Sequence, residues 1–69
     1  RSIERGSIVV AEGIAVVCSA EIAEEVVRDA LDLRPRVVAF LEDGFAGMDT
    51  LKANAFTKAR ELGITMKTV

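Results

Sequence analysis

The sequence predicts a small two-layer α/β protein with the element order ββαβαβ. Four short runs rich in Val and Ile alternate with two segments whose apolar residues recur at helical spacing. Two strand-helix-strand units in this order imply a mixed, mostly parallel four-stranded sheet, because such units join parallel strands. We expect the strands in the order 1-2-3-4, accompanied by two helices.

Length and composition limit what the chain can be. It has 69 residues, of which 51% are hydrophobic. That length allows one domain, near the size at which a single core is only just sufficient. The chain begins with Arg1 rather than Met. We therefore interpret residues 1–69 as a single module from a longer protein, with residues 1–6 as a linker-like lead-in.

Charge and residue content argue against several function classes. The net charge is −2, with acids and bases interspersed, whereas a free-standing nucleic-acid binder normally shows a basic patch. The chain has no His and one Cys, Cys18, so it lacks the commonest general base and a thiolate metal set. We expect a cytoplasmic module with no catalytic residue, no cofactor-binding residue and no metal ligand.

The first two strands are expected at residues 7–11 and 14–18. The two-residue connection between them, Glu12-Gly13, is typical of a β-hairpin. Both runs are apolar on both sides, although a strand covered on one side only should alternate with polar residues. A high apolar content in so small a body predicts that some of this surface faces a partner.

A helix is expected after the hairpin. Ser19 is the predicted N-cap, and the helix runs to about Leu33, because Pro35 does not allow it to continue. Glu24 and Arg28 have the spacing of an ion pair on its exposed side. The carboxylates of this segment are interpreted as solvated helix surface.

The second half predicts a strand, a helix and a strand. The strand covers residues 37–41, and the helix opens with Asp49 as N-cap and ends before Gly63, a good C-cap residue. The last strand, residues 64–69, carries Lys67 and suits the edge of a sheet. If the sheet grows in one direction, both helices cover one face, and the other face exposes Val, Ile or Phe side chains of the two central strands. A doubly wound arrangement would remove that exposed face.

The loop of residues 42–49 follows a strand at its carboxyl end, where open α/β sheets place functional residues. Its glycines, Gly44 and Gly47, belong to neither GxxxxGK[ST] nor GxGxxG, so no phosphate-binding loop is predicted. We interpret both glycines as residues that supply a positive φ in a tight turn.

Lys52 lies in the first turn of the second helix, inside its apolar arc. Two interpretations are open. Its amine pairs with Glu42 or Asp43 and locks the loop against the sheet, or its side chain extends past the sheet edge into water. Asn54 falls on the polar side of the helix.

The second half also carries a pattern that matches a known family. The pattern consists of a strand, the acidic pair Glu42-Asp43, the step Gly44-Phe45, the set Asp49, Leu51, Lys52 and Asn54, and the ending Gly63-Ile64 and Thr68-Val69. This run resembles the C-terminal domain of type III restriction–modification DNA methyltransferases, the modification subunit. Met48 departs from the polar residue, usually Asn, that the family has there. The first half agrees only in general character.

The resemblance implies a parent that is an adenine-N6-specific methyltransferase using S-adenosylmethionine in a prokaryotic cytoplasm. The DPPY-type and Phe-x-Gly-x-Gly motifs of such enzymes are absent from this chain. The resemblance therefore implies a non-catalytic docking module without a cofactor of its own. Its partner would be the rest of the parent, a second copy or the restriction subunit, and DNA would be reached through the parent. The signature residues form a structural latch: Glu42, Asp43, Gly44, Phe45, Gly47, Asp49, Lys52 and Asn54.

Two other functions remain open from the sequence. One is a small-ligand-binding or regulatory α/β domain that uses the loop of residues 42–49. The other is an accessory DNA-contacting domain, for which the basic residues are Arg34, Arg36, Lys58 and Arg60.

Overall fold

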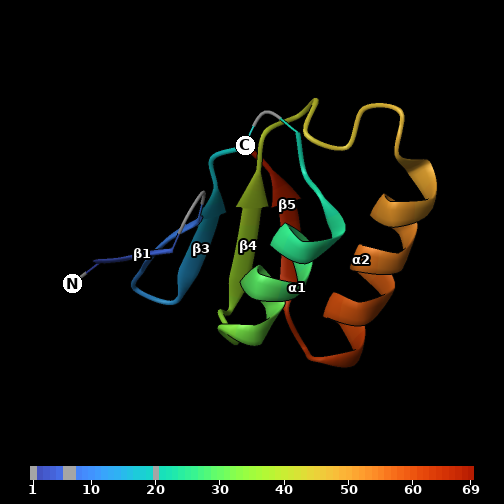
Figure 1. Cartoon of the computed structure of the whole chain (residues 1–69). Helices are drawn as coiled ribbons and strands as arrows, with labels where there is room; N and C mark the ends of the chain where they lie inside the picture. The colour runs from blue at the N-terminus through green and yellow to red at the C-terminus, as the bar shows by residue number, and fades with distance from the viewer. Residues whose placement is uncertain (1, 6–7, 20) are drawn as a thin grey trace.

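The computed structural model describes residues 2–5, 8–19 and 21–69, which form a small α/β protein with one sheet and two helices (Figure 1). The elements in chain order are β1 (Ser2–Arg5), β2 (Ile8–Ala11), β3 (Ile14–Val17), α1 (Glu24–Asp32), β4 (Val37–Phe40), α2 (Asp49–Glu61) and β5 (Thr65–Thr68).

The sheet has five strands in the order β1-β2-β3-β4-β5. Strands β1, β2 and β3 pair antiparallel, and β3, β4 and β5 pair parallel. The expected succession of four neighbouring strands is therefore present as β2 to β5. The sheet differs from the expectation by one additional strand.

That additional strand, β1, lies in the part of the chain that the sequence assigned to a lead-in. Ser2–Arg5 pairs with Ile8–Ala11 and forms one edge of the sheet. The segment SIER has a single large apolar residue, so its pattern does not indicate a strand. An edge strand needs only a neighbour with free backbone N–H and C=O groups, and β2 supplies one.

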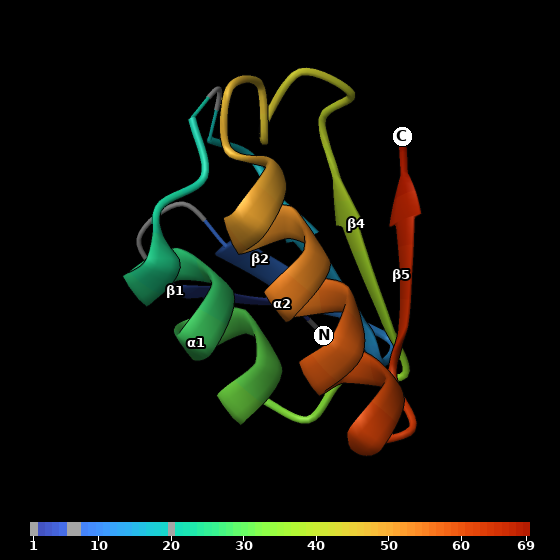
Figure 2. The ribbon, with the colours of Figure 1, turned by 90° about the vertical axis from the view of Figure 1, so that its right-hand side faces the viewer.

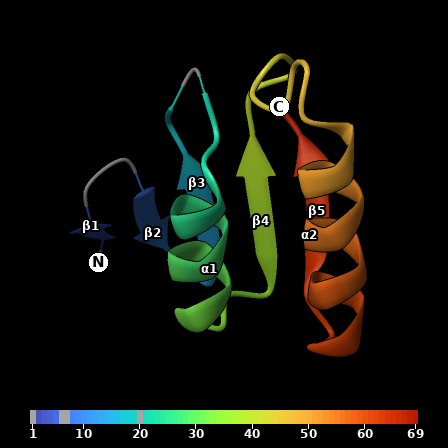
Figure 3. The ribbon, with the colours of Figure 1, turned by 45° about the vertical axis from the view of Figure 1, so that its right-hand side comes forward.

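Both helices cover the same face of the sheet (Figure 3). Helix α1 connects β3 to β4, and α2 connects β4 to β5, so both connections step in the same direction. Because such crossovers are right-handed, they place both helices on one side. The doubly wound alternative is therefore wrong.

The predicted hairpin is confirmed. Glu12 has φ 54° and Gly13 has φ 80°, as a two-residue type I′ turn requires. The turn is fastened to β4 by Arg36, whose backbone N–H donates to the Gly13 carbonyl at 2.7 Å. The Arg36 guanidinium also donates to the Glu12 carbonyl, at 2.8 Å.

Neither helix has the predicted N-cap: α1 begins later than expected, and α2 begins one residue earlier. The N-cap of α1 is Ala23 rather than Ser19, because the segment before it is held extended by a contact with the distant loop. In that contact the Ile22 N–H donates to the Gly44 carbonyl at 2.9 Å. The N-cap of α2 is Met48, and Asp49 is the first helical residue, where its charge still complements the helix dipole.

The end of α2 follows the prediction. Gly63 comes directly after the C-cap and has φ 73°. Its N–H donates to the Arg60 carbonyl at 3.1 Å, and the Ile64 N–H donates to the Ala59 carbonyl at 2.8 Å. This is a Schellman motif, and both Ala59 and Ile64 are buried in the core.

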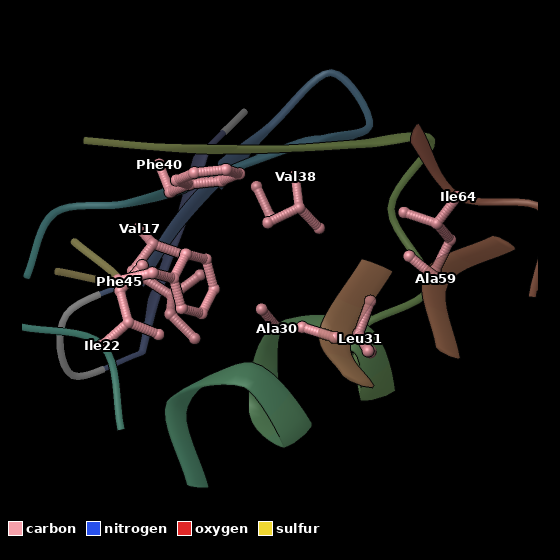
Figure 4. Packing of buried hydrophobic residues seen from close by; sticks show 12 residues of the cluster. Val17, Ile22, Ala30, Leu31, Val38, Phe40, Phe45, Ala59 and Ile64 are labelled. Atoms are coloured by element: carbon pink, nitrogen blue, oxygen red, sulfur yellow. The ribbon is translucent and has the colours of Figure 1, made fainter. Parts of the chain in front are cut away.

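The two helices form one layer against the sheet (Figure 2), and the core lies between these two layers (Figure 4). Phe40 of β4 is fully buried at its centre. The Phe40 ring contacts Phe45 edge to face, with centroids 5.1 Å apart, and Phe56 in the same manner at 5.9 Å. Aliphatic side chains from the helices and from β2, β3 and β4 complete the cluster.

Candidate functional site

The loop of residues 42–49 is fastened to the core by Phe45 and Gly44. The Phe45 side chain is 4% exposed and packs beside Phe40 and Ile22 (Figure 4). Gly44 is buried, and a Cβ there would lie 2.7 Å from Ile22 Cδ1. Gly44 is therefore required for close packing rather than for a positive φ, which corrects the prediction; Gly47, with φ 75°, agrees with it.

The charged residues of the loop do not form the predicted ion pair. Glu42, Asp43 and Lys52 are all exposed. Within the described residues, no ion pair of 4.0 Å or less joins the Lys52 amine to either carboxylate. The exposed position of Lys52 agrees with the other interpretation, a side chain that reaches water.

The loop offers no space for a ligand at Phe45. The cavity that Phe45 lines has a volume of about 10 Å³ and apolar walls inside the core. That is at the lower limit for one water molecule, and its walls offer no hydrogen-bond partners. Among the described residues, no group of three or more His, Cys, Asp or Glu side chains has the arrangement of a metal site.

A larger hollow lies between the two helices, on the side away from the sheet. This interhelical groove has a volume of about 520 Å³. Its lining combines apolar residues (Val27, Leu31, Leu51, Ala55 and Leu62) with polar and charged ones (Glu24, Arg28, Asp32, Arg34, Thr50, Asn54 and Lys58). The sequence did not indicate this groove, because the separation of two helices is not encoded in either helix alone.

The basic residues that an accessory DNA-contacting domain would use do not all lie at one place. Arg34 and Lys58 line it together with Arg28. Arg36 instead binds the hairpin turn. Glu24 and Asp32 also line the groove, so its lining is not the basic patch that DNA binding requires.

The remaining surface of interest is the face of the sheet that the helices do not cover, which we call the open face. Alternation along the strands directs Ile8, Val17, Val38 and Phe40 into the core. The intervening residues of the central strands point the other way. These open-face residues are Val9 and Ala11 of β2, Ile14 and Val16 of β3, and Val37 and Ala39 of β4.

Strand register arranges the open face in two rows. Val9, Val16, Ala39 and Lys67 form one row, and Ala11, Ile14, Val37 and Thr65 form the other. Both rows are apolar until they reach β5, where Lys67 and Thr65 are exposed. Ile14 is 37% exposed and Ala39 is 8% exposed, and the other open-face residues are half-buried. None of the elements in the described residues packs over these rows.

The open face is the surface that the sequence predicted for a sheet growing in one direction. Its apolar residues form a contiguous patch, which makes the open face a candidate interaction surface. Its position follows from strand order, and its composition follows from strands that are apolar on both sides.

No family model matches the chain, and neither a curated protein nor a solved structure resembles it significantly. No helix in the described part of the chain is long and apolar enough to cross a membrane. The fold defines a small α/β domain with one covered and one open sheet face.

Proposed function

We propose that this chain is a non-catalytic docking module that binds a protein partner through the open face. The apolar residues of that face, among them Ile14, Val16 and Val37, carry the proposal. Burial of apolar surface is favourable by roughly 25 cal/mol per Å². The covered face already has its layer of helices, so the open face is the side on which a partner gains this energy.

The parent proposed for the module is a site-specific DNA adenine-N6 methyltransferase of a type III restriction–modification system. This part of the proposal is supported by the sequence pattern of residues 37–69. In the parent, S-adenosylmethionine and the transfer chemistry belong to segments other than this chain. The partner is the rest of the parent, a second copy or the restriction subunit.

Docking is tested in the longer parent protein by a substitution that places a charge on the open face of this module. Ile14→Lys is expected to reduce subunit assembly strongly, because a lysine buried in an apolar contact lacks a counter-ion. Ala53→Lys adds the same charge at an exposed position of α2 and serves as the matched control. Co-elution in size-exclusion chromatography is the measurement, with circular dichroism to verify folding. Equal assembly of both variants would contradict docking.

The identity of the parent is tested by the reading frame that precedes Arg1 in the encoding DNA. A DPPY-type motif and a Phe-x-Gly-x-Gly motif are expected there. A long upstream frame without either motif would contradict the methyltransferase assignment. The docking function would then depend only on the result for Ile14→Lys and Ala53→Lys.

The interhelical groove favours a second candidate, a small-ligand or regulatory domain. Its volume of about 520 Å³ lies within the range of ligand sites. Apolar side chains such as Leu31 and Leu51, with Arg28 and Lys58 nearby, suit a ligand with an apolar body and a carboxylate. Titration with decanoate tests this function by NMR, and absence of shifts at Leu31 and Leu51 would contradict it.

A further inference from the structure

We infer that the open face binds a second copy of this chain, face to face, about a two-fold axis that runs close to β3. The inference rests on the proposed docking function and names the partner for it. It follows from the sizes of the side chains that the two rows of the open face carry in β2 and β4, the strands on either side of β3.

Strand β3 is the middle strand of the five, with β2 and β1 on one side and β4 and β5 on the other. A rotation of 180° about β3 therefore places β2 over β4 of the second copy. Sheets packed in this aligned manner lie about 10 Å apart and interdigitate their side chains.

The open face is complementary to itself under this rotation. In the first row, Val9 comes opposite Ala39 of the second copy. In the second row, Ala11 comes opposite Val37 of the second copy. Each pair joins a larger side chain to a smaller one, as close packing between layers requires. Ile14 and Val16 lie on β3 and each meet their own copies.

The position of Lys67 distinguishes a two-fold axis along β3 from a two-fold axis that runs across the strands. With the axis along β3, β5 of one copy lies over β1 of the other, so the two Lys67 residues lie at opposite edges of the contact. With an axis across the strands, β5 lies over β5 and brings two Lys67 residues to the same edge. Repulsion between these like charges disfavours the axis across the strands and leaves the axis along β3.

The size of the open face predicts a weak dimer. Five strands about 4.8 Å apart and four residues of about 3.3 Å each give a flat area of roughly 300 Å² per copy. Standard interfaces bury about 800 Å² per partner, so association is expected to depend on concentration. Two copies held together by a larger assembly would pair more readily, because their effective concentration is higher.

Sedimentation velocity up to about 1 mM protein measures this association. We expect the average mass to rise with concentration, and Ile14→Lys to lower the association constant at least about tenfold, because it places two lysines at the centre of the contact. Ala53→Lys on α2 should leave the association unchanged. A monomer at every concentration would overturn the dimer.

Cross-linking tests the position of the axis. In a Cys18→Ser background, Val16→Cys is expected to cross-link with itself through a short bis-maleimide. Val9→Cys and Ala39→Cys should cross-link faster with each other in a mixture than either does alone, by several-fold. Equal rates for all combinations would overturn the axis along β3.

The two inferences fail in different ways. If the chain stays monomeric and Ile14→Lys still disrupts assembly of the longer parent, the open face docks a different partner and only the second-copy inference fails. If Ile14→Lys changes neither property while circular dichroism shows a folded chain, the docking function fails as well.

Discussion

The covered face and the open face of the sheet differ less in residue type than in what lies against them. Val16 and Val17 are neighbours on β3 and have the same side chain. Val17 is 3% exposed in the core beneath the helices, whereas Val16 is half-buried on the other side. Position relative to the helix layer, rather than hydrophobicity, therefore decides which apolar residues belong to the core.

The two faces also differ in side-chain volume. Phe40 anchors the covered face through two edge-to-face contacts, with Phe45 and Phe56. The open face has only Val, Ile and Ala in its central strands. The covered face therefore has large aromatic side chains at its centre, whereas the open face carries only smaller aliphatic ones.

The largest effect is expected from truncation of the core aromatic. Phe40→Ala should lower the free energy of unfolding by about 3–5 kcal/mol, because it removes buried area and leaves a cavity. Val37→Ala, one of the open-face residues on the same strand, should cost no more than about 1 kcal/mol. Urea unfolding followed by circular dichroism measures both, and equal losses would show that the open face also contributes to the core.

Val16 and Val17 allow the open face and the covered face to be compared with the same substitution on one strand. Val17→Thr should cost about 1–3 kcal/mol, because the hydroxyl is buried among apolar side chains. Val16→Thr should stay within about 0.5 kcal/mol of the parent, because its hydroxyl reaches water. Urea unfolding of the monomer at low concentration gives the difference. A loss at Val16 as large as at Val17 would contradict the assignment of the two faces.

An effect of similar or smaller size is expected at the loop that packs on the covered face. Gly44→Ala should cost about 1–3 kcal/mol, because the new methyl group meets Ile22 Cδ1. Ile22→Val removes that atom, so the two changes together should cost less than their sum in a double-mutant cycle. Thermal unfolding of the four chains is the measurement, and strict additivity would exclude the Ile22 contact as the cause.

The smallest effect is expected away from both faces, after α1. Arg34 has φ 53°, a conformation that glycine adopts without strain. Arg34→Gly should therefore change stability by no more than about 1 kcal/mol, as relief of strain is offset by the greater freedom of the unfolded chain. Thermal unfolding measures it, and a large loss would show that the Arg34 side chain makes a stabilising contact.

Much of the fold could be predicted from local sequence patterns. The order of the elements β2 to β5, the Glu12-Gly13 turn and the Gly63 cap all depend on backbone preferences that act within a few residues. The open face was predicted only on the condition that the sheet grows in one direction. That condition concerns distant strands, and the strand order of the folded chain satisfies it.

What the sequence determined by itself was therefore the kind and order of the elements from β2 to β5, the Glu12-Gly13 turn, the Gly63 cap of α2, and the apolar character of both sides of the central strands. Only the tertiary structure decided that β1 joins the sheet, that α1 starts at Glu24, that Phe45 and Gly44 hold the loop, and that a groove separates the helices. Each of these features depends on contact between segments far apart in the chain. Such contacts compete with local preferences, as the Ile22 to Gly44 hydrogen bond does, and neither segment alone encodes the outcome.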